Sequence, residues 1–282
     1  MAQNTQTPAV DFFKFDLGNN SALQKDFQKI FEENNGNWAK IKPQLEGNKA
    51  FINVLPKLEF TQNLSVLSNN NEAFVAHFQK DATINSMADI GLKLNKVAFV
   101  AQVQEFTPVG EDKMVFANNA FNQVFNQVPT AVLVNMIEDP KVPILNNVVG
   151  SQTAEILKSN PHFNIKTTSV YNLINDTKNF EQVPAALQAE VTTQLKTLGR
   201  LVNIAHVPEA VPILYNKNLH TSGIISSIPP NQFLAMMKDN GLSDEDVHQI
   251  HQQAQIRTAQ IQDAMMGMYE LERGINFGIM KA

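Results

Sequence analysis

The sequence contains no cysteine. Disulfides, zinc–cysteine centres and thiol catalysis are therefore excluded. Arginine is also scarce, because only Arg200, Arg257 and Arg273 occur among the 22 basic residues, and the formal net charge is -5. A surface that follows a phosphate backbone needs clustered lysine and arginine, and no such cluster is present. We therefore expect no nucleic-acid partner.

Long apolar runs are absent as well. The longest, near Val128–Ile137 and Leu201–Ile204, fall far short of the roughly 20 residues that a membrane helix needs. The first residues, MAQNTQTPAVDFF, have neither the basic nor the apolar region of a signal peptide. We expect a protein without a membrane span, made in the cytoplasm without a signal peptide. If it leaves the cell, we expect release as part of a large secreted complex.

The composition is that of a folded chain. With 282 residues, 43% of them hydrophobic and 17% charged, it can form one large domain or two modest ones. Proline and asparagine become frequent between Asp139 and Pro161, which favours a boundary there. We therefore predict a disordered N-terminus over residues 1–15, a first helical subdomain over 16–139 and a second over 140–282.

Helix signals dominate the chain. Capping pairs, in which a serine precedes Gln or Asp by three residues, occur at Ser21/Gln24, Ser86/Asp89 and Ser243/Asp246. After the last pair, an apolar stripe with helical spacing continues to about Arg273, which predicts a long C-terminal helix of about 45 Å. We assign this stripe to the core: Val247, Ile250, Ala254, Ile261, Met265 and Met268. Strand signals are limited to brief runs such as Val142–Leu145, so we predict an all-α, irregular multi-helix array.

A weak pattern occurs twice, about 137 residues apart, in Leu64–Ala98 and Leu201–Leu234. Each copy begins with a leucine-rich helical turn and continues through a Glu-Ala pair into an apolar-aromatic run. A serine before a short apolar segment follows in both copies. The pattern predicts an internal duplication of a helical unit.

One histidine pair could hold a metal. His248 and His251 share a face of the predicted helix, one turn after Asp244. The chain has no HExxH pattern, however, and glutamines occupy positions where a helical metal site would use carboxylates. A solvated polar face is the preferred interpretation, and a metal-dependent hydrolase using this pair is the weakest alternative.

Other candidate residues have structural interpretations. His206 can bond free carbonyls at a helix end, and the serines at 222, 226 and 227 lack a nucleophile elbow and fit caps and turns. The acidic run 244–246 complements a helix N-terminus. Five methionines could form an adaptable groove but are assigned to the core: Met236, Met237, Met265, Met266 and Met268. We expect no catalytic residue, no cofactor and no metal.

The second copy of the pattern, with its flanks, resembles the helical region of Tc (ABC-type) insecticidal toxin A subunits. The resemblance begins in LKTLGRLVNIA, continues through a helix pair and a segment with Ser222, Ile225 and Phe233, and ends in the helix Val247–Ala254. Upstream, VPTAVL and SNPHFNI are similar to two further motifs of the family. The order of these short motifs, spread over roughly residues 16–273, carries the resemblance. Gly199 and Asn164 depart from the family's Gln and Asp.

The resemblance implies a part of the A-subunit shell. Subunits of that family are very large pentamers with a channel, whereas this chain contains only the helical segment, so pore formation is not implied. We hypothesise a non-enzymatic helical scaffold or docking module of a toxin or injection-type assembly, with the other protein subunits of that complex as partners. The alternative is a free-standing cargo or effector protein that binds a host factor.

Overall fold

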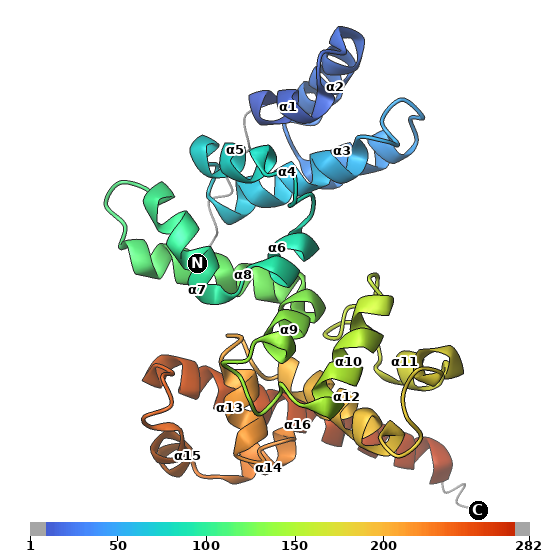
Figure 1. The fold of residues 1–282 in the computed structure, drawn as a ribbon, viewed down its shortest axis with the longest axis vertical. Coiled ribbons are helices and arrows are strands. Elements are labelled where there is room, and N and C mark those ends of the chain that lie inside the picture. The colour runs from blue at the N-terminus through green and yellow to red at the C-terminus, as the bar shows by residue number, and fades with distance from the viewer. Residues whose placement is uncertain (1–9, 274–282) are drawn as a thin grey trace, which may run out of the picture. The chain divides into compact units, whose positions relative to one another are not determined.

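The computed structural model describes residues 10–273, with side chains to residue 270. Within this range the chain forms sixteen α-helices and three short 3-10 helices and no strand, so the all-α prediction is confirmed (Figure 1). The segment 142–145, which carried a strand signal, forms turns. Pro143 lies inside this segment and has no amide hydrogen to donate to a strand partner.

The described residues fold as two compact units that are divided between Asn135 and Met136. The expected boundary, between residues 139 and 140, lies about one helical turn further along the chain. The helices that begin in the first unit are η1 (Val10–Phe13), α1 (Lys14–Leu17), α2 (Ser21–Glu33), α3 (Trp38–Glu46), α4 (Leu55–Leu67), α5 (Glu72–Lys80), α6 (Met87–Lys93), α7 (Lys96–Val103), η2 (Gln104–Phe106), α8 (Lys113–Gln127) and α9 (Pro129–Glu138).

The second unit continues with eight helices. They are α10 (Val148–Ser159), α11 (Tyr171–Ile174), η3 (Thr177–Phe180), α12 (Gln188–Val202), α13 (Ala210–Asn216), α14 (Ser222–Ser227), α15 (Pro230–Met237) and α16 (Asp244–Arg273). The last is the predicted long C-terminal helix, and its capping pair is present: Asp246 N–H donates to Ser243 Oγ over 3.1 Å, and Ser243 Oγ donates to Asp246 Oδ2 over 2.6 Å.

The start of the chain is more ordered than we expected. The predicted disordered stretch covers residues 1–15, of which 1–9 lie outside the described residues and 10–15 are helical. Phe13 is fully buried, with its ring centroid 5.0 Å from that of Phe27 and stacked on Trp38 at 5.8 Å. The prediction was wrong for residues 10–15 because these aromatic partners bury an N-terminal segment that looks polar by itself.

The two copies of the sequence pattern have the same helix order. In the first unit α4 packs on α5, and α6 and α7 then pack on α8; in the second α12 packs on α13, and α14 and α15 pack on α16. Figure 1 shows each set as consecutive segments of the ribbon. The two stretches thus share a helix order, and the internal duplication stays a prediction.

The helices that follow the two copies of the sequence pattern, α8 and α16, differ in length. α8 has 15 residues and ends at Gln127, two residues before the proline that begins α9. α16 has 30 residues and continues without interruption. α16 is therefore twice as long as α8.

Gly150 in α10 shows how closely the backbone packs in the second unit. A Cβ added at this glycine would lie 1.8 Å from the Leu145 carbonyl oxygen and 3.2 Å from the Ile137 side chain. The nearest atom belongs to the backbone and cannot rotate away. The Leu145 carbonyl, in the turn before α10, therefore packs directly against residue 150, where only glycine leaves room for it.

We predict that Gly150→Ala lowers the free energy of unfolding by about 2 kcal/mol or more, because the backbone must shift to accept the methyl group. The control is Gly223→Ala in α14, where an added Cβ meets no atom within 4 Å. That change is expected to be neutral or to stabilise the helix by up to about 1 kcal/mol. Urea unfolding followed by circular dichroism measures both variants, and equal stabilities would contradict the packing described here.

Candidate functional site

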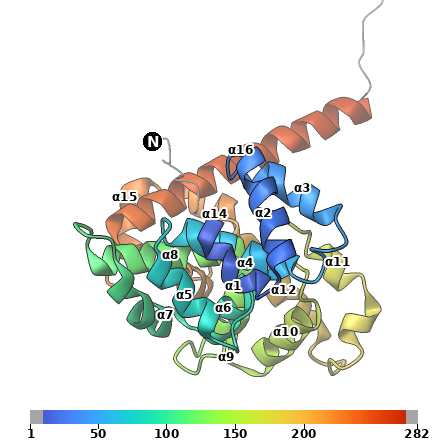
Figure 2. The same ribbon diagram turned by 90° about the horizontal axis from the view of Figure 1, so that it is seen from above.

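The most exposed apolar surface of the second unit lies on the outer half of α16, which we define as residues 259–270. All residues of this segment are exposed except Gly267, which is partly buried. Figure 2 shows the helix as one straight rod that extends past α14 and α15. Ile261, Met265 and Met268 are 53%, 51% and 64% exposed. The sequence assignment of these three residues to the core was wrong.

This surface continues a face that is buried in the inner half of the helix. Val247, His251 and Ala254 are buried, and Ile261, Met265 and Met268 repeat their spacing two heptads later. At about 100° per residue, a residue two heptads further on drifts by only about 40°, so both triplets lie on the same side of the helix. Helices α14 and α15 cover the first triplet and no described residue covers the second.

The physical reason lies in helix lengths. α14 and α15 contain six and eight residues, so each is about 9–12 Å long, whereas α16 extends for about 45 Å. The apolar periodicity of α16 is visible in the sequence, but the sequence does not show where its neighbours end. Met236 and Met266 are also exposed, and of the five methionines only Met237 is buried.

The histidine pair of the metal hypothesis has other roles. His251 is buried, donates from Nε2 to the Ile228 carbonyl over 2.8 Å, and lies against Phe233 at a ring-centroid distance of 5.3 Å. His248 is exposed and donates from Nδ1 to the Asp244 carbonyl over 2.7 Å. Among the described residues no group of three or more His, Cys, Asp or Glu side chains could hold a metal ion.

His206 joins the segment between α12 and α13 to the start of α16. Its Nε2 lies 2.8 Å from Asp246 Oδ1. Burial raises the pKa of Asp246, but the hydrogen bonds from Ser243 and His206 outweigh it and hold this pKa below its ordinary value. The acidic residue at 246 is therefore a cap and an anchor for the segment.

The three candidate serines take part in local packing and hydrogen bonds. Ser222 is buried, and Ser226 and Ser227 donate to the carbonyls of Gly223 and Ile224. Ser226 Oγ also lies 3.1 Å from Thr258 Oγ1, which ties α14 to α16. These contacts are structural.

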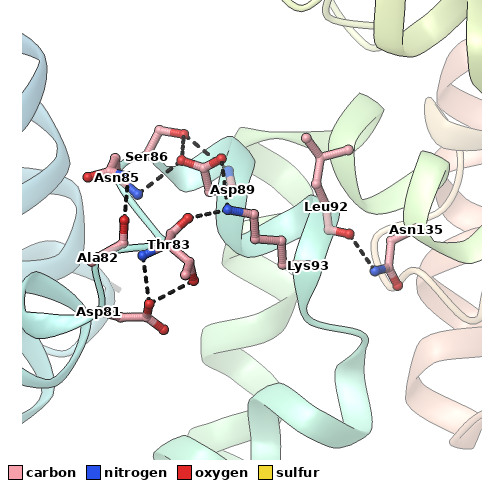
Figure 3. A network of polar contacts seen from close by, with 9 residues as sticks. All are labelled: Asp81, Ala82, Thr83, Asn85, Ser86, Asp89, Leu92, Lys93 and Asn135. Carbon is pink, nitrogen blue, oxygen red and sulfur yellow. Dashed lines mark hydrogen bonds and ion pairs between the residues drawn. The ribbon is translucent and has the colours of Figure 1, made fainter.

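A network of polar side chains fixes α6 in the first unit (Figure 3). Ser86 Oγ donates to Asp89 Oδ2 over 2.9 Å, which is the predicted capping pair. Lys93 Nζ lies 3.8 Å from Asp89 Oδ1 and donates to the Thr83 carbonyl, while Asn135 Nδ2 donates to the Leu92 carbonyl over 2.7 Å. These polar groups bond to one another and to carbonyls at helix ends. The network therefore positions α6 and presents no reactive group.

Comparison of the chain with protein-family models, with curated proteins and with solved structures gives no match. No helix in the described part of the chain is long and apolar enough to cross a membrane.

One carboxyl group has a strongly shifted pKa. Asp16 Oδ2 accepts a hydrogen bond from Thr61 Oγ1 over 2.6 Å, and Gln79 Nε2 donates to Thr61 Oγ1 over 2.7 Å and to the Phe12 carbonyl over 3.0 Å. Burial raises the pKa of Asp16 to about 6, against the opposing effects of Thr61, Lys57 and Gln79. The network joins α1, α4 and α5. Because burial disfavours the charged form of Asp16, the negative charge of this carboxylate at neutral pH destabilises the folded state.

We predict that stability falls as the pH rises from about 4 to about 6, because the folded state holds the Asp16 proton more tightly than the unfolded state over that range. Asp16→Asn keeps an oxygen that accepts from Thr61 and removes the charge. It should abolish this slope and stabilise the protein at pH 7.5 by at most about 3 kcal/mol. Urea titrations at pH 5 and pH 7.5 measure the effect, with the exposed Asp26→Asn as control. A slope unchanged by Asp16→Asn would refute it.

Proposed function

We propose that the protein is a non-enzymatic helical scaffold or docking module of a larger protein assembly, and that the outer half of α16 is its docking element. The uncovered apolar side chains of Ile261, Met265 and Met268 carry this proposal. An anchored extension needs no new helix nucleus, so the inner half supports a helix that would be marginal alone. A partner that covers these side chains removes apolar surface from water.

The preferred occupant is an apolar helix face of a different subunit. The two-heptad repeat of the stripe suits packing along a second helix. The charged residues of the outer half, Asp263 and Glu270, are both acidic. A second copy of this chain aligned in parallel would place these like charges close together, whereas a helix with neutral or basic flanks would complement them.

The assembly itself is proposed to be of the toxin or injection type, because of the resemblance to Tc toxin A subunits. A free-standing effector is the second candidate. The two differ in stoichiometry, since a scaffold stays with its assembly in fixed proportion and an effector is released.

We predict that the untagged protein sediments in a megadalton fraction of lysate from its native host. A triple variant carries Ile261→Gln, Met265→Gln and Met268→Gln, which replace the three exposed apolar side chains of the outer half by polar ones. It should reduce the co-sedimenting fraction about tenfold or more, because the apolar anchors of the interface are lost. The matched control is Met266→Gln, which alters an equally exposed methionine on another side of the same helix.

Both variants are expected to retain the wild-type circular dichroism spectrum, since none of the changed side chains is buried. Sedimentation of the wild-type chain as a 31.4 kDa monomer would contradict the scaffold proposal and favour the effector. Co-sedimentation of the triple variant at the wild-type level would exclude the outer half as the docking element.

A further inference from the structure

A second surface of the same unit has the properties of a binding groove. It is a depression of about 610 Å³ lined by α16 from Glu245 to Gln260, by the segment 203–206 that follows α12, and by Lys166. Two contacts hold its sides together: Arg257 Nη2 donates to Asn203 Oδ1 over 2.6 Å, and His206 bonds Asp246 over 2.8 Å. The groove is therefore built into the fold, and it lies apart from the apolar stripe of the outer half.

One end of the groove is cationic. Lys166 and Arg257 both line it, and Lys166 is partly buried. Burial, and then the nearby Arg257 guanidinium, lower the pKa of Lys166. Arg257 donates hydrogen bonds to the neutral side chains of Asn203 and Gln260 and has no ion-pair partner among the described residues. An anion between the two cations would relieve their repulsion.

Besides Ile204, Ala205, His206 and Ile256, the rest of the groove is lined by amides and ends at a carboxylate. The side chains of Gln252 and Gln253 make no hydrogen bond to any described residue, and each offers both donors and an acceptor. Glu245 lines the opposite end. From Glu245 to Gln260 the groove follows α16 for about 23 Å, the length of about seven extended residues.

We propose that this groove binds an extended acidic peptide segment of a partner protein, with a carboxylate between Lys166 and Arg257. The glutamine amides pair with the backbone of the segment, and Glu245 favours a basic residue at its other end. The arrangement fits a peptide better than a free phosphate, because a phosphate would contact the cationic end alone, whereas an extended segment also contacts the glutamine amides.

An array of heptapeptides tests this inference. Each peptide carries a lysine at one end and either two carboxylates or the corresponding two amides at the other, and both chain directions are included. The best binder is then labelled with fluorescein and titrated with the full-length protein. We expect the acidic peptides to bind about tenfold or more tightly than their amide counterparts, and added salt to weaken them.

Arg257→Gln and, separately, Lys166→Gln should each weaken binding of the acidic peptide about tenfold. The matched control, Arg200→Gln, removes an exposed arginine of α12 that does not line the groove and should leave affinity within about twofold. Equal binding of acidic and amide peptides, an Arg257→Gln variant that binds like the wild type, or binding of inorganic phosphate with no peptide binding would overturn the inference.

The groove does not depend on the proposed docking element. The triple variant of the outer half keeps every groove residue, so it should bind the acidic peptide with wild-type affinity. Failure of peptide binding in a protein that still co-sediments with its assembly would eliminate the groove alone.

Discussion

The length of α16 relative to the helices that cover it determines which of its apolar side chains remain exposed. Val247, Ile250 and Ala254 are buried against α14 and α15, and burial of side chains such as Val and Ile contributes about 1.5–3 kcal/mol each. This contact fixes the direction of the whole helix. The two short helices end before the apolar stripe does, so the same stripe becomes an exposed surface on a helix that is anchored at its start.

The helices that follow the two copies of the sequence pattern differ in length. In the first copy, the corresponding helix ends after 15 residues, and Pro129 begins α9 as a separate element. In the second copy no proline intervenes before Arg273, and the helix reaches 30 residues. α16 therefore continues past the helices that cover its start, and its outer half presents exposed apolar side chains.

The helices of this protein could be predicted largely from local signals. The capping pairs at Ser86 and Ser243, and the continuous apolar period after Ser243, are local features, and the structure places helix starts there. At the first predicted pair, however, the capping side chain is that of Asn20, one residue before Ser21, and it accepts from Leu23 N–H over 3.1 Å. Asn and Ser are both favourable N-cap residues, so the sequence alone does not determine which of the two caps the helix.

The surfaces could not be predicted in the same way, because they depend on contacts between distant segments. The stripe of α16 looks the same in sequence whether it is covered or exposed. The groove requires Lys166, Asn203 and Arg257 to meet, and these residues are far apart in the chain. Gly199 likewise has an explanation that depends on a distant segment, because an added Cβ would lie 2.8 Å from Val170 Cγ2.

The most direct test of the account is hydrogen–deuterium exchange of the isolated protein and of the same protein in its sedimenting assembly. Amides of residues 259–270 should exchange faster than those of the inner half in the isolated chain, because no packing protects them. Assembly should slow exchange most strongly in residues 259–270. If the assembled protein shows unchanged exchange in this segment, the outer half of α16 is not where the protein docks.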